Sequence, residues 1–156
     1  MGGEKSNEYQ LIKEIISRSV SGQWDEAKQE WHLSEIYRED EPLTCLCGHT
    51  PIIEICVLKN KLNNKDAIVG NVCVNKFLGI ASEQIFAGLR RIKKDINKGL
   101  SPAATAYSHE RGWLNDWEKE FCLNTSRKRA LSEKQKTVRV KINLRVLSKV
   151  TNMLKL

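Results

Sequence analysis

The sequence predicts an α+β protein, with an N-terminal helix and strand, a β-hairpin in the middle and a helical C-terminal half. Three observations predict this class: apolar residues recur at helical spacing near both ends, two β-rich runs flank a turn-forming stretch, and helix caps punctuate the second half. A chain of 156 residues fits one compact domain. We expect residues 1–40 to pack a helix and a strand onto the core, residues 41–81 to form the hairpin module, and residues 82–156 to be helical and basic.

The N-terminal half divides into a helix, a strand and a hairpin. Residues 7–20 place a leucine and three isoleucines on one side of an amphipathic helix, and residues 30–40 alternate as a strand does. The β-rich runs "PIIEICVLKN" and "AIVGNVCV" are joined by "KLNNKD", whose Asn and Asp residues tolerate turn conformations. We therefore expect a hairpin over residues 52–73, with Cys73 at the end of its second strand.

Helix-capping signals organise the C-terminal half. Residues 83–98 carry an apolar stripe between basic side chains, and Gly99 is suited to end that helix. Ser101 followed by Pro102 marks the start of a second helix, and Asn115 marks the start of a third. These signals predict three consecutive helices.

Residues 137–147 fit two structures. Alternate residues from Val138 to Val146 are apolar, which is the pattern of a strand. Ser132 and Gln135 form a capping box, and the same segment also carries an apolar stripe at helical spacing. The capping signal and the length of the segment favour a helix.

Aromatic residues cluster just before this segment. Trp113, Trp117 and Phe121 lie four residues apart and would share one face of a helix. Together with Tyr107, the two tryptophans have the rings needed to stack on bases. Aromatic side chains at this spacing are more often part of a core, so we expect them inside.

The composition is that of a globular protein, with 40% hydrophobic and 29% charged residues. No run reaches the ~18–20 apolar residues that span a bilayer. The N-terminal "MGGEKSNEYQ" lacks the apolar segment of an export signal, so we expect a cytoplasmic protein. Disulfides are rare there, and clustered cysteines are more often metal ligands or buried thiols.

Positive charge is concentrated at the C-terminal end. The whole chain has a formal net charge of +7, whereas residues 126–156 alone contribute +9. Such a segment can neutralise nucleic-acid phosphates and release their counterions, with little sequence preference. An acidic protein surface would attract the same charges. The candidate phosphate contacts are Arg127, Lys128, Arg129, Lys134, Lys136 and Arg139.

Three cysteines have the arrangement of metal ligands. Cys45 and Cys47 flank one residue on a tight turn, where Gly48 permits a left-handed conformation. A hairpin returns the chain to where it began, so Cys73 can meet that turn. Thiolate sulfur is a preferred zinc ligand, and tetrahedral zinc sites take four ligands.

The fourth ligand is open between two residues. Cys56 lies about midway along the first hairpin strand and would complete a four-cysteine site, whereas His49 would supply an imidazole nitrogen. Cys122 has the surroundings of an ordinary buried thiol. Two other interpretations of the cluster remain: buried thiols that bind nothing, or a catalytic thiol with His49 as its base.

The segment "TCLCGHTPIIEICVLKNKLNNKDAIVGNVCVNKFLG" resembles a zinc-finger module found in small proteins of bacteriophages and mobile elements. The downstream "AYSHERGWLNDWEKEFCLNTSRKRALSEKQ" resembles the helical segment after the finger in those proteins, so the resemblance covers roughly residues 24–147. It implies a treble-clef-like fold around one structural zinc ion, with the knuckle, the hairpin and then a helix. Here only Cys73 comes from the helix-side segment, which departs from treble clefs that draw two ligands from it. The residues that carry the likeness are Cys45, Cys47, Gly48, Asn60, Val69, Gly70, Cys73, Val74 and Phe77.

These observations lead to one principal functional hypothesis and two alternatives. The first is a non-enzymatic, zinc-containing nucleic-acid-binding protein of phage or mobile-element type, which would act in the bacterial cytoplasm. Zinc held by four protein ligands has no open position for a substrate, so such a site is structural. The second is an interaction module that inhibits an acidic host protein. The third is a treble-clef nuclease, for which His49 with Glu54 or Asp66 would have to bind a second metal.

Overall fold

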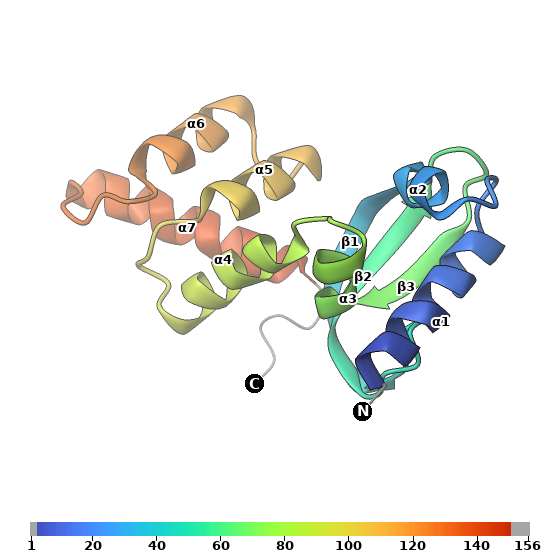
Figure 1. Ribbon diagram of the computed structural model, residues 1–156. Coiled ribbons are helices and arrows are strands. Elements are labelled where there is room, and N and C mark those ends of the chain that lie inside the picture. The colour runs from blue at the N-terminus through green and yellow to red at the C-terminus, as the bar shows by residue number, and fades with distance from the viewer. Residues whose placement is uncertain (1–2, 151–156) are drawn as a thin grey trace. The chain divides into compact units, whose positions relative to one another are not determined.

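The computed structural model describes residues 3–150 and confirms the α+β class. The chain divides into two compact units, Met1–Ser82 and Glu83–Leu156. The first contains a three-stranded antiparallel sheet, and the second consists of helices (Figure 1). None of the helices in the described part of the chain has the length and apolar character needed to cross a bilayer.

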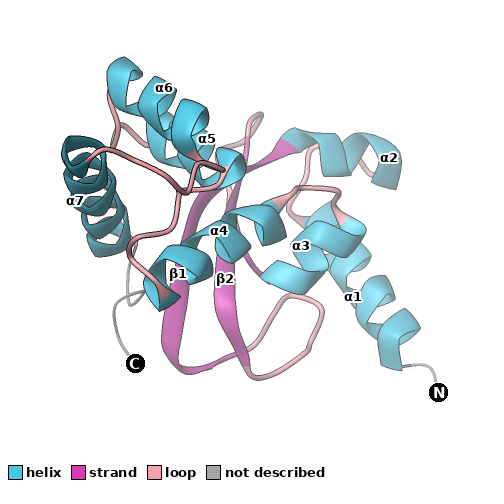
Figure 2. Ribbon diagram, turned by 90° about the vertical axis from the view of Figure 1, so that its left-hand side faces the viewer, coloured by secondary structure: helices cyan, strands magenta, loops and turns pink. Residues whose placement is uncertain are grey.

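The first unit is built around the sheet β1-β2-β3. Strand β1 (Trp31–Leu43) pairs with β2 (Ile52–Asn60), which pairs with β3 (Asp66–Gly70), so β2 is the central strand. Figure 2 shows β1 and β2 running side by side. The core of this unit draws apolar side chains from helix and sheet: Leu11, Ile15, Ile36, Ile55, Leu58 and Val69 are all buried.

The N-terminal helix α1 (Gly3–Ser17) begins four residues before the predicted segment and ends three residues earlier. The hydroxyl of Ser19 donates to the carbonyl of Ile15, so a side chain takes the place of the next backbone donor. The following backbone is held elsewhere, because the N–H groups of Val20 and Ser21 donate to the Glu30 carboxylate at 2.7 and 2.8 Å. The short helix α2 (Trp24–Ala27) and the 3₁₀ turn η1 (Lys28–Glu30) lead from there into β1.

The predicted hairpin is present, but its second strand is shorter than expected. Strand β3 ends at Gly70, and the helix α3 (Asn71–Phe77) follows directly, so Cys73 lies in a helix and not at the end of a strand. The turn between β2 and β3 is organised by Asn60, whose side-chain oxygen accepts from the N–H groups of Leu62 and Asn63. This matches the turn chemistry expected of "KLNNKD".

Up to residue 150, where the described part ends, the second unit contains four helices: α4 (Ser82–Lys94), α5 (Pro102–Glu110), α6 (Asp116–Thr125) and α7 (Glu133–Lys149). The Ser101 side chain caps α5, and capping boxes start α6 and α7, so the cap signals in the sequence are confirmed. The ambiguous residues 137–147 are therefore helical. Only the end of α4 differs, at Lys94, because the Asp95 carboxylate accepts from the Asn97 N–H and begins a turn.

Glu30 joins three segments of the first unit. Besides accepting from Val20 and Ser21, its carboxylate accepts from the Asn60 side-chain amide at 2.8 Å. The hydrogen bond from Asn60 and those from the backbone lower the pKa of Glu30 below its ordinary value. The charged form is therefore the form that the fold favours.

We expect acid to destabilise the first unit through Glu30. A lowered pKa gives stability that is present above the unfolded-state value and is lost as the pH falls through the folded-state value. Urea unfolding followed by amide signals of residues 6–82 should lose more stability between about pH 7 and about pH 3 in the wild type than in Glu30→Gln. An equal loss in both proteins would contradict this role.

Candidate metal centre

The knuckle after β1 places two cysteines side by side. The Cys45 N–H donates to the His49 carbonyl at 2.9 Å, and the Gly48 N–H donates to the Cys45 carbonyl at 2.8 Å, which closes a tight turn. Gly48 has a φ of +92°, a conformation that residues with a Cβ rarely adopt. The expected role of Gly48 in the turn is therefore confirmed, and Cys45 and Cys47 both become buried.

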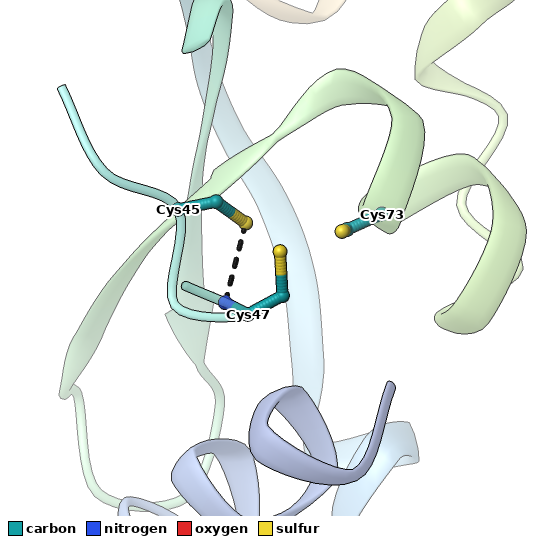
Figure 3. Close-up of side chains that lie close together, drawn as sticks. All are labelled: Cys45, Cys47 and Cys73. Atoms are coloured by element: carbon teal, nitrogen blue, oxygen red, sulfur yellow. Dashed lines mark hydrogen bonds between the residues drawn. The ribbon is translucent and has the colours of Figure 1, made fainter. Parts of the chain in front are cut away.

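Cys73 reaches the knuckle from the first turn of α3. As Figure 3 shows, the side chains of Cys45, Cys47 and Cys73 point toward one another. Their three sulfur atoms all lie within 4.8 Å of one another. Thiolates on a tetrahedral ion with bonds of ~2.3 Å are separated by ~3.8 Å, so small rotations bring these sulfurs to the required spacing. The cluster could hold a metal ion.

Backbone N–H groups point at the sulfurs. Gly70 donates to Cys45 Sγ at 3.2 Å, Cys47 donates to the same atom at 3.5 Å, and His49 donates to Cys47 Sγ at 3.4 Å. A Cβ at Gly70 would lie only 3.1 Å from Ile52 Cγ2, so glycine allows this strand end to pack closely. Such donors favour the thiolate form, which is the form that binds metals.

The three thiols differ in how readily they lose their proton. A hydrogen bond from Cys73, aided by the backbone donors, lowers the pKa of Cys45 to about 5. The same hydrogen bond raises the pKa of Cys73, and burial raises the pKa of Cys47. Like charges this close disfavour one another, so three thiolates coexist here only beside a cation.

Cys56 is not part of the cluster, and its prediction as the fourth ligand is not supported. It lies in the middle of β2, paired with Ile36 on one side and Val69 on the other, and is fully buried. Its sulfur is outside the group that the other three cysteines form. The strand register pairs Cys56 with Val69, the residue before Gly70, so Cys56 lies on the central strand near the cluster while its sulfur does not join it. Cys122, in α6, is a buried thiol, as expected, and burial raises its pKa to about 11.

His49, the other candidate, lies beside the cluster with an exposed side chain. It lines a pocket of about 650 Å³ together with the three clustered cysteines. The rest of the wall is mixed in character, with the basic Arg38 and Lys76, the acidic Glu54 and apolar residues such as Phe77. In the described part of the chain, no ring nitrogen or carboxylate oxygen joins the three sulfurs within 4.8 Å, so the His49 imidazole does not belong to the group in this conformation.

Comparison with protein-family models, with curated proteins and with solved structures found no match to this chain. Its function is therefore inferred from the chemistry of its own residues.

Five of the six predicted phosphate contacts are exposed, and they lie in the loop between α6 and α7 and in the first turns of α7: Arg127, Lys128, Arg129, Lys134 and Lys136. Arg139 differs from the prediction because it is buried. Its guanidinium donates to the backbone carbonyls of Asn97, Thr125 and Lys128, which gives it a structural role. The charge pattern of the sequence does not show which basic residue of a helix faces the interior, because all of them carry the same charge.

The aromatic residues also depart in part from expectation. Trp117 is 62% exposed and stacks on Phe121, with ring centroids 5.4 Å apart, so its placement in the core was wrong. Trp113 packs against the buried Tyr107, with ring centroids 5.6 Å apart. Trp113 precedes α6, so the expectation that it shares a helix face with Trp117 and Phe121 was wrong, and both Trp113 and Phe121 are half-buried. The sequence also gave no sign that the backbone carbonyl of Asn97 accepts a hydrogen bond from Arg139.

Proposed function

We propose that this chain is a non-enzymatic zinc protein that binds nucleic acid through its basic C-terminal unit. One observation carries the metal half of this proposal: three buried sulfurs from two separate segments lie within 4.8 Å of one another. The nucleic-acid half is supported by the exposed Arg and Lys residues around the start of α7.

Zinc suits the donor set. Thiolates are soft ligands, and zinc accepts tetrahedral sulfur coordination without a redox change. The ion would join the knuckle of residues 45–48 to α3 across the end of the hairpin, in the manner of a treble clef. Because the ligands are brought together only in the folded chain, the binding free energy would stabilise the fold.

His49 is the residue we propose as the fourth ligand. It follows Cys47 by two residues and lines the same pocket as the three cysteines. Its side chain is exposed, so a rotation that brings the imidazole to the ion disturbs no packed core. Three thiolates and one imidazole would leave no position open for a substrate, which supports a structural ion.

The basic surface supports binding to phosphates in preference to bases. Arg127, Lys128 and Arg129 are consecutive, exposed and followed by a helix whose first turns carry Lys134 and Lys136. Charges of this kind contact the backbone, which is the same in every sequence. We infer low sequence specificity and a steep dependence on salt.

An acidic protein is the second candidate partner, and one observation favours it. Trp117 is 62% exposed beside Phe121, and exposed aromatic residues are enriched in protein interfaces. In that case Trp117, in the first turn of α6, would be an aromatic anchor, and the basic residues beyond the other end of α6 would pair with acidic groups of the partner.

We expect elemental analysis to find about one zinc ion per chain, as a single tetrahedral site requires. Cys73→Ser should abolish zinc binding and unfold the first unit, because the ion contributes to folding. Cys122→Ser is the matched control, since it alters a buried thiol of the other unit, and Cys56→Ala should also retain zinc. A folded, zinc-free wild type with five titratable thiols would overturn the metal proposal.

The role of His49 has a spectroscopic test. In the cobalt-substituted protein, His49→Ala should alter the visible bands of the tetrahedral site, and added imidazole should restore them. Removing even an outer-shell partner of a metal ligand costs roughly 10–100-fold in affinity, so His49→Ala should weaken zinc binding by at least about tenfold. Unchanged spectra and affinity would mean that an external molecule takes the fourth position. His32→Ala, which alters an exposed histidine of β1, is the control.

Nucleic-acid binding should follow counterion release. We expect the affinity for a random oligonucleotide to fall by at least about tenfold as salt rises from about 50 to about 200 mM, because several phosphate contacts are replaced by cations. Fluorescence anisotropy measures this directly. If no binding occurs even at the lower salt concentration, the nucleic-acid hypothesis fails and the acidic protein partner becomes the leading one.

A further inference from the structure

A hollow of about 270 Å³ lies in the C-terminal unit, lined by Asn97, Arg129, Leu131, Lys136 and Arg139. Three of these five residues are cationic, a fourth carries an amide, and no carboxylate is among them. The hollow is formed by three segments: the turn after α4, the loop between α6 and α7, and the first half of α7. A water molecule occupies about 30 Å³ of liquid, so the space is large enough for a tetrahedral anion.

Buried side chains of α7 hold the other two segments in place. Arg139 donates to the carbonyls of Thr125 and Lys128 at the end of α6 and just beyond it, and to the carbonyl of Asn97 in the turn after α4. One turn further along, the Asn143 amide donates to the carbonyls of Ile96 and Lys98 at 2.9 and 2.8 Å. The backbone around the hollow is therefore fixed by hydrogen bonds before any ligand arrives. A loop whose backbone is already fixed loses less entropy on binding than a flexible loop does.

The charge around the hollow favours an anion. Arg129 and Lys136 are exposed and come from different segments, and the buried Arg139 lines the same space. Two carboxylates lie close by. Asp95 accepts from the backbone and side chain of Asn97, and Glu133 pairs with Lys136 at 3.3 Å. The Glu133 side chain is 92% exposed, and a solvated pair of this kind contributes little, so an anion can displace it.

We propose that this hollow seats one backbone phosphate of a nucleic-acid strand, an inference that rests on the proposed function. Arg129 provides a planar fork of N–H donors that matches two phosphate oxygens, and Lys136 provides a point charge from α7. Arg139 positions the loop that carries Arg129 and adds a positive charge beneath the anion. Exposed basic residues outside the hollow, such as Arg127 and Lys134, then contact neighbouring phosphates at the open surface.

The seat is tested with two charge-matched double variants and a single-stranded thymidine oligonucleotide. Arg129→Ala/Lys136→Ala removes two charges from the hollow, and Arg127→Ala/Lys134→Ala removes two charges from the same segment outside it. All four side chains are exposed, so both variants should fold, which amide spectra verify. At about 100 mM salt we expect the first variant to bind about tenfold more weakly than wild type and the second about threefold more weakly.

A second measurement locates the contact. Titration of wild type with the oligonucleotide should shift the amide signals of Asn97 and Leu131, and the shifts should be lost in Arg129→Ala/Lys136→Ala. Equal weakening of both variants, or unshifted Asn97 and Leu131 signals in a wild type that binds, would overturn the seat while the proposed function stands. A wild type that does not bind the oligonucleotide even at low salt would overturn both.

Discussion

The convergence of three buried sulfurs is the constraint on which the first unit depends. Cys45 and Cys47 belong to a turn, and Cys73 belongs to a helix that begins where the hairpin ends. Three thiols this close resist full ionisation in the interior unless a cation balances them. The backbone donors of Gly70 and of the knuckle are aimed at the same atoms, so the local fold is arranged around the sulfurs.

The second unit depends on hydrogen bonds from buried side chains to backbone carbonyls. The helix α7 sends two buried polar side chains, Arg139 and Asn143, to backbone carbonyls of distant turns. Buried polar groups need partners, and unpaired carbonyls cost free energy. Each pairing therefore satisfies both sides and holds irregular backbone in one conformation. That rigidity is what allows a loop rich in Arg and Lys to present its charges in a defined arrangement, where a charged tail would present them diffusely.

The predictions that rest on interactions between residues close in sequence succeeded, whereas errors arose where the structure depends on contacts between distant residues. The side chains of Ser101, Asn115 and Ser132 cap helices by accepting from the backbone N–H three residues later in the chain. All three caps were predictable from the sequence. Trp117 was placed in the core and is exposed, whereas Arg139 was placed on the surface and is buried. Both errors concern which face of a helix meets a neighbour, and that depends on contacts far along the chain.

The sequence by itself determined the class of the fold, the chemistry of the knuckle and the concentration of positive charge, because these follow from local propensity, from Gly48 and from composition. Only the tertiary structure decided which cysteines meet. Cys45 and Cys47 are close because one residue separates them. Cys73 joins them from the first turn of α3, whereas the sulfur of Cys56, on the central strand β2, stays outside the group. Strand register and helix placement arise from the packing of the whole unit, and spacing along the chain does not encode them.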